Sequence, residues 1–147
     1  MHPRHVKTAA VVAGGALALW LLCRLVRGAA WGGSAAVADA AKAVAARMGI
    51  PVTSEKRSLA DTQRVGSTTA SDHYTGNLTA YAVDFGVAGA RGDELAQALA
   101  QAYGFPREKL GTFQHHQVEI AGKAFRLQLL WRVDGHYDHV HLGIRRV

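Results

Sequence analysis

Two groups of side chains, far apart in the sequence, could together bind one catalytic metal ion. His73 and Asp84 belong to the first group, and Asp138, His139 and His141 form the second. A catalytic zinc ion takes three protein ligands from imidazoles and carboxylates, and it keeps one position open for water. The sequence therefore predicts that His73, Asp84 and His141 bind one Zn²⁺ ion, and it leaves one carboxylate over.

The remaining carboxylate, Asp138, is the predicted general base. Such a base deprotonates the metal-bound water while the metal polarises the carbonyl that the water attacks. His139 and His141 are two residues apart, so on a strand they leave the same face about 7 Å from each other. Asp138 can turn in from the loop before the strand without entering the coordination sphere. We therefore expect His141 to bind the metal and His139 to face the substrate or support the ligand.

These residues together resemble a family of cell-wall peptidases. The motif reads Ser71-x-His73-x-x-Gly76, then Ala82-x-Asp84, then Asp138-x-x-His141. It is similar to the motif of the zinc D-Ala-D-Ala carboxypeptidases and dipeptidases and of the phage L-Ala-D-Glu endolysins. The resemblance extends over residues 48 to 145. It implies the same zinc ligands and the same base, and it implies hydrolysis of peptide bonds in peptidoglycan stem peptides.

The resemblance also implies roles for residues around the metal. In that family an arginine in a Ser-x-x-Arg-Ser context steadies the substrate or the developing oxyanion, and residues 54 to 58 match this context. Arg57 inherits that role. Ser71 would help to orient the site. His136 lies in the turn before the second group and could line the cleft with His139, so we count both, together with Ser71, as substrate-binding candidates.

The sequence departs from the family pattern in two ways. Five residues, 77 to 81, separate Gly76 from Ala82, where the family usually reads Gly-x-Ala-x-Asp, so the loop beside the metal is lengthened. The base is Asp138, where many relatives carry glutamate. Endolysin-like members with aspartate favour an endopeptidase over a carboxypeptidase, and the scissile bond stays open between L-Ala-D-Glu, D-Ala-D-Ala and the cross-link.

Two other functions are compatible with parts of the pattern. The segment 138 to 142 also resembles the His-hydrophobe-His strand of single-strand DNA nicking nucleases, where a helical tyrosine, here Tyr103, attacks the phosphate. The pI of about 9.9 suits nucleic acid, but this alternative leaves residues 71 to 84 unexplained, so we expect no nucleic-acid partner.

A non-catalytic, zinc-stabilised wall-binding module would use the same ligands for folding. The intact Asp138 argues against it.

The N-terminal residues indicate a membrane-directed segment. Residues 8 to 23 carry no charge and lie between basic residues. They predict either a short membrane anchor or a signal peptide with a cleavage candidate at 28 to 30. The chain therefore divides into a segment 1–30 and a zinc peptidase domain 31–147, membrane-anchored or exported and facing the cell wall. The single cysteine, Cys23, excludes a disulfide framework within the chain. We expect the protein to be a monomer.

The hydrophobic pattern predicts an α+β domain with helices packed on a small, mainly antiparallel sheet. Such an arrangement matches the D-Ala-D-Ala peptidase or hedgehog-like fold that the resemblance implies. Ser34 is the expected cap of the first helix, and His115 and His116, adjacent on a strand, are expected to be structural or solvent-facing. The expected elements are helices at 35–49 and 93–103, a long loop at 58–80, and strands at 81–86, 112–120, 124–133 and 139–145.

Overall fold

A computed structural model describes residues 20, 24 and 30–147, and these residues form three α-helices and one sheet of five strands. The helices are α2 (Gly33–Arg47), α3 (Leu59–Arg64) and α4 (Gly89–Tyr103), with 3-10 turns η1 (Ala30–Gly32) and η2 (Arg107–Lys109). The strands are β1 (Val52–Ser54), β2 (Ala80–Gly86), β3 (His116–Ile120), β4 (Lys123–Leu130) and β5 (His139–Arg146). All neighbouring strands pair antiparallel in the order β1-β2-β5-β4-β3. The predicted α+β class with an antiparallel sheet is confirmed.

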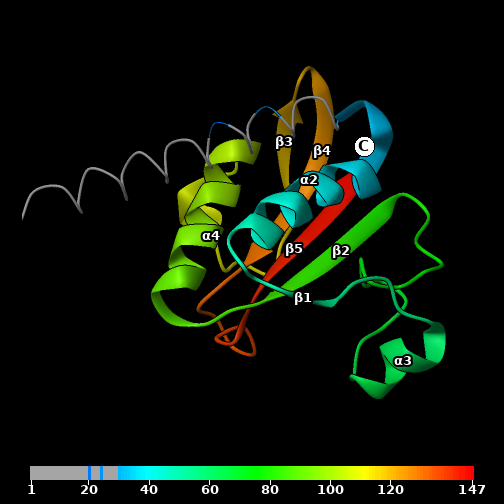
Figure 1. The fold of residues 1–147 in the computed structure, drawn as a ribbon. Coiled ribbons are helices and arrows are strands. Elements are labelled where there is room, and N and C mark those ends of the chain that lie inside the picture. The colour runs from blue at the N-terminus through cyan, green and yellow to red at the C-terminus, as the bar shows by residue number, and fades with distance from the viewer. Residues whose placement is uncertain (1–19, 21–23, 25–29) are drawn as a thin grey trace, which may run out of the picture.

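The two faces of the sheet have different surroundings (Figure 1). Successive side chains of a strand point to opposite faces, and in β5 the alternate residues Val140, Leu142 and Ile144 are fully buried. They share one hydrophobic core with residues of α2 and α4, so the helices cover that face. His141 and Arg145 therefore leave the other face of the same strand. We call that other side, which carries no helix of this core, the open face.

The helices pack on the core face through small and aliphatic side chains. Helix α2 buries an alanine-rich stripe that includes Val37 and Val44, and α4 buries Leu95 and Leu99. Tyr103, at the end of α4, is 1% exposed and its hydroxyl donates a hydrogen bond to the carbonyl of Val37 at 2.7 Å. Burial raises the pKa of Tyr103 far above its ordinary value. The tyrosine thus joins α4 to α2 inside the core.

Several predicted boundaries differ from the observed ones. Helix α2 begins after Gly32, and Ser34 lies inside it, where its hydroxyl donates to the carbonyl of Thr79 at 2.8 Å rather than capping the helix. The predicted loop 58–80 contains α3, which Ser58 caps by accepting a hydrogen bond from the Asp61 amide. Helix α4 begins four residues earlier than expected, and β3 begins four residues later. Strand β4 ends at Leu130, earlier than the predicted residue 133, whereas β5 runs to Arg146, one residue past its predicted end.

The predicted anchor or signal segment, residues 1–30, lies almost entirely outside the described residues. In the part of the chain that the structure describes, no helix combines the length and the apolar character that crossing a bilayer requires.

Candidate metal centre

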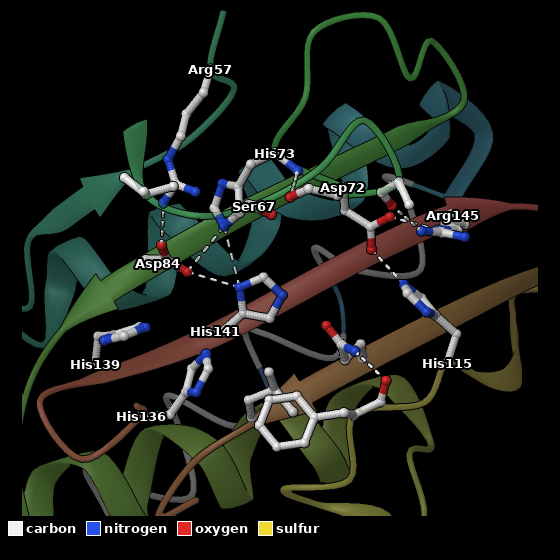
Figure 2. A pocket seen from close by; sticks show the side chains of 16 residues that line it. Arg57, Ser67, Asp72, His73, Asp84, His115, His136, His139, His141 and Arg145 are labelled. Atoms are coloured by element: carbon white, nitrogen blue, oxygen red, sulfur yellow. Dashed lines mark hydrogen bonds and ion pairs between the residues drawn. The ribbon is translucent and has the colours of Figure 1, made fainter. Parts of the chain in front are cut away.

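The three predicted metal ligands meet on the open face. Asp84 on β2 and His141 on β5 are direct cross-strand partners, so their side chains leave the sheet next to each other. His73 comes from the loop between α3 and β2 and lies over them, as Figure 2 shows. All three residues are buried, with exposed fractions between 4% and 7%. Register therefore brings two ligands together, and the loop adds the third.

The distances between the three side chains fit a single metal ion. His73 Nε2 lies 3.2 Å from Asp84 Oδ1 and 3.3 Å from His141 Nδ1, and His141 Nδ1 lies 2.8 Å from Asp84 Oδ1. In a tetrahedral zinc site with bonds of about 2.0–2.1 Å, neighbouring ligand atoms are about 3.3 Å apart. Two of the three separations match the edges of such a tetrahedron, and the third, at 2.8 Å, is shorter. His73, Asp84 and His141 could therefore hold a metal ion.

The backbone fixes the tautomer of His73. Its Nδ1 lies 2.5 Å from the carbonyl oxygen of Glu55. A carbonyl only accepts hydrogen bonds, so Nδ1 carries the proton and Nε2 turns its lone pair toward the other two ligands. A metal-binding histidine commonly donates its second N–H to such an oxygen, which orients the ring and raises its basicity.

The charges at the centre also suit a metal. Burial favours the neutral form of Asp84, but its close contacts with the imidazoles of His141 and His73 outweigh it and hold the pKa of this carboxyl well below its usual range. The second carboxylate oxygen accepts a hydrogen bond from Arg57 Nη2 at 3.1 Å. Burial lowers the pKa of His141, which favours the neutral imidazole. An ionised carboxylate with neutral imidazoles is the protonation state that binds a divalent metal.

The loop that carries His73 is organised around a lysine. Lys56 Nζ donates to the backbone carbonyls of Asp72, Tyr74, Asn77 and Ala80 at 2.6–3.1 Å. These four carbonyls span the lengthened loop that distinguishes the sequence from the family pattern. Burial lowers the pKa of Lys56, and the carbonyl oxygens solvate its ammonium group in place of water. One side chain thus supplies the loop with an internal cation.

Lys56→Met is expected to destabilise the domain by about 2–4 kcal/mol, because it leaves several buried carbonyls without a donor. We also expect zinc affinity to fall by about tenfold, since the loop that positions His73 loosens. Urea unfolding and metal titration measure the two effects. The exposed Lys109→Met is the matched control and should change neither quantity. Wild-type stability in Lys56→Met would show that the carbonyls find other partners.

A second group of residues lies beside the metal ligands. The Asp72 carboxylate accepts hydrogen bonds from His115 Nε2 and Arg145 Nε, both at 2.5 Å. Burial favours the neutral acid, but these two partners outweigh it and lower the pKa of Asp72. The sequence predicts a structural or solvent-facing His115 on a strand; instead it lies just before β3 and lines the cleft. His116, the other member of that pair, packs edge-on against Phe105.

Gly143 makes room for this group. It lies on β5 between the positions of His141 and Arg145, and a Cβ atom there would be 2.5 Å from Asp72 Oδ2 and 3.2 Å from His141 Nε2. Only a residue without a side chain lets the Asp72 carboxylate lie against the sheet at this point. The sequence pattern did not single out Asp72, Gly143 or Arg145, and only the glycine inside a predicted strand could have indicated a close approach.

Gly143→Ala is therefore expected to displace Asp72 and the His141 ring. We expect zinc affinity to fall by about 10- to 100-fold and stability to fall by about 1–3 kcal/mol. The double variant with Asp72→Ala tests the cause, because removing the clashing carboxylate should restore part of the zinc affinity. Strictly additive losses in metal titrations would contradict this explanation.

Of the other predicted site residues, four line a cleft beside the candidate ligands and one, Asp138, does not. Arg57, Ser71, His136 and His139 all line a cleft of about 590 Å³ that the three ligands also line. The Ser71 hydroxyl accepts a hydrogen bond from the His73 amide at 3.2 Å, which agrees with an orienting role. Arg57 is bound to Asp84 and to Ser54, so it positions a ligand, and its contact with substrate stays a prediction.

Asp138 differs from these residues because it does not line the cleft. Its side chain is 88% exposed, and its Oδ1 accepts a hydrogen bond from His139 Nδ1 at 2.7 Å. This bond lowers the pKa of Asp138. The His139 ring does line the cleft, and the ring of His136 lies between those of His139 and His141, at 4.7 and 5.9 Å. To reach the metal itself, the carboxylate would have to turn away from His139.

Comparison with known proteins gives no relative. A scan of the chain against protein-family models and searches of curated proteins and of solved structures find no match. The function of the site has to be inferred from its residues and their geometry.

Proposed function

We propose that this chain is a zinc-dependent peptidase that hydrolyses a peptide bond in peptidoglycan stem peptides. The observation that carries the proposal is the buried group of His73, Asp84 and His141, whose ligand atoms lie within 4.8 Å of one another beside an open cleft. The substrate class comes from the motif that these residues share with the cell-wall peptidases. We extend the same resemblance to the fold, and propose a D-Ala-D-Ala peptidase-like domain.

The donor set supports zinc among the divalent metals. Two imidazole nitrogens and one carboxylate oxygen form a combination that catalytic zinc sites use, whereas magnesium and calcium prefer oxygen ligands alone. The group has three protein ligands and borders a cleft, which leaves room for a water or a substrate oxygen. A bound zinc ion would polarise the substrate carbonyl and lower the pKa of water.

The chain's own residues would move the proton. Asp138 is our proposed base, either after turning toward the metal or through the His139 ring to which it is bonded. A carboxylate that accepts a histidine Nδ1–H leaves Nε2 of that ring as the proton acceptor. Arg57 fixes the Asp84 carboxylate from behind, so the ligand geometry is held before substrate binds.

The cleft suits a peptide with polar groups. Its volume of about 590 Å³ lies within the common range for ligand sites, and histidines and arginines dominate its polar wall. Phe113 and Leu130 give it a small apolar part. We further propose that the domain faces the cell wall, either tethered by its N-terminal segment or exported, and that it acts as a monomer.

The nuclease alternative has less support. It needs Tyr103 as a nucleophile next to His139 and His141. Tyr103 is instead buried in the core on the helix-covered side of the sheet, and its hydroxyl is bonded to Val37. A non-catalytic binding module could use the same cleft and ligands, but it assigns no role to the Asp138–His139 pair.

The test is digestion of purified peptidoglycan by the full chain in detergent, loaded with zinc. New amino termini in the released peptides, identified by mass spectrometry, are the expected result and would define the scissile bond. The His141→Ala variant is the negative control, and a labelled single-stranded DNA serves as the alternative substrate. Unchanged wall peptides with zinc-loaded protein would contradict the proposal, and cleaved DNA would replace it with the nuclease.

A further inference from the structure

Two arginines lie side by side on the open face, and one of them, Arg145, lines the cleft at the end away from the candidate metal ligands. Arg126 on β4 and Arg145 on β5 are direct cross-strand partners. Arg126 alternates with the core residues Phe125 and Leu127, so it points to the open face, as Arg145 does. Like charges directly opposite each other destabilise a sheet. A bound anion would therefore offset the repulsion between the two guanidinium groups.

The protein supplies only part of that compensation. Arg145 donates from Nε to Asp72 and from Nη2 to the carbonyl of Ala70 at 2.7 Å. The other oxygen of Asp72 already binds His115. None of the ion pairs among the described residues includes Arg126, although Glu119 lies diagonally across from it on β3. The buried Asp72 carboxylate thus compensates Arg145, while Arg126 adds a positive charge that no ion pair among the described residues offsets.

The residues around Asp72 border the cleft. Arg145, His115 and Gln128 line it together with the metal ligands, and Figure 2 shows the Asp72 group and the metal group as two ends of one site. His141 and Arg145 are four residues apart on β5, and Arg145 reaches back to a carboxylate that lies over Gly143. The two ends are therefore roughly 7 to 13 Å apart.

We propose that Arg126 and Arg145 form an anion subsite that binds a carboxylate of the substrate peptide, two to four residues from the scissile bond. An extended peptide covers about 3.3–3.6 Å per residue, so this is the reach that the distance between the two ends allows. Arginine is suited to the role because its planar guanidinium pairs with both oxygens of a carboxylate. The inference rests on the proposed peptidase function and specifies its substrate: an acidic stem peptide cut within the chain.

The subsite also separates endopeptidase from carboxypeptidase substrates. A carboxypeptidase that removes one residue needs a carboxylate only one residue from the scissile bond. That separation is too short for a guanidinium held beside Asp72. The carboxylate that the subsite binds therefore belongs to an internal acidic residue of the stem.

The experiment measures binding separately from cleavage. The zinc-loaded full chain in detergent is titrated by calorimetry at low temperature, which slows cleavage during the measurement. One ligand is a synthetic stem peptide with a free internal carboxylate, and the other is the same peptide with that carboxylate replaced by a carboxamide. We expect the amide to bind about five- to tenfold more weakly, as for the loss of one charge-assisted contact. Arg126→Gln should bind both peptides equally weakly. The exposed Arg107→Gln is the matched control and should keep the wild-type preference.

Each outcome decides between the two proposals. Acid and amide peptides that bind equally, or an Arg126→Gln variant that keeps the preference, would overturn the subsite even if the peptide is cut. A preserved preference for the acid without any cleavage would overturn the peptidase function and leave the anion site standing. No binding of either peptide would overturn both. Inorganic phosphate is the competitor, and phosphate that binds more tightly than the acid peptide would overturn the assignment to a carboxylate.

Discussion

Replacing His141 by alanine is expected to lower zinc affinity by more than about 100-fold and to abolish peptide hydrolysis. Loss of a residue that only supports a metal ligand commonly costs 10- to 100-fold in affinity. His141 would supply a ligand atom itself, since its Nδ1 lies 2.8 Å from Asp84 Oδ1 and 3.3 Å from His73 Nε2. Competition with a chromophoric chelator measures the affinity. Mass spectrometry of digested peptidoglycan measures the activity.

His116→Ala is the control for this experiment. His116 is only partly buried, and it contacts Phe105 and Thr112 rather than the three ligands. We expect this variant to bind zinc as the wild type does. Tight zinc binding by His141→Ala would mean that the metal centre is built from other residues, and the proposed function would lose the observation that carries it.

Replacing Asp138 by asparagine is expected to lower kcat by about 10²- to 10⁴-fold, the usual contribution of a general acid or base. The substitution removes the negative charge but keeps an acceptor for His139 Nδ1. Because the side chain is 88% exposed and does not belong to the metal group, zinc affinity and thermal stability should stay at wild-type values. Steady-state kinetics on a stem peptide, combined with metal analysis, separates these effects.

The variant His139→Gln decides how Asp138 acts. If the carboxylate turns in and takes the proton directly, Asp138→Asn should lose more activity than His139→Gln. If the His139 ring takes the proton, His139→Gln should show the larger loss. Asp134→Asn, an exposed carboxylate in the same turn region, is the control and should keep full activity. Full activity in both Asp138→Asn and His139→Gln would rule out this pair as the base.

The three candidate metal ligands could be picked out from the sequence because the chemistry of a metal site is restrictive. Few combinations of His and Asp fit a catalytic zinc site, and His73, Asp84 and His141 were the combination that the motif spacing favoured. What the sequence could not provide is the strand register. Asp84 and His141 are 57 residues apart, and nothing local determines that they become direct partners. The structure adds that pairing.

The second group of residues was missed because it depends on loop geometry. Asp72, His115 and Arg145 come from three segments, and their meeting depends on a glycine at position 143 and on the lysine inside the loop. Hydrophobic periodicity carries no information about such contacts. Helix α3 was missed for a different reason, since Ser58 and Asp61 do form the Ser-x-x-Asp signature of a helix start. That signal was present within a stretch whose overall polarity suggested a loop.

The division of the sheet into a helix-covered face and an open face has an evolutionary consequence. Residues that determine stability and residues that bind ligands alternate along the same strands, so each can mutate without directly altering the packing of the other. Insertions between α3 and β2, or before β3, would change the surface around the cleft. The hydrophobic core beneath would keep its contribution to stability. A lineage with this architecture could therefore shift from one ligand to another by exchanging loops, which makes these two connections the natural targets for redesigning its specificity.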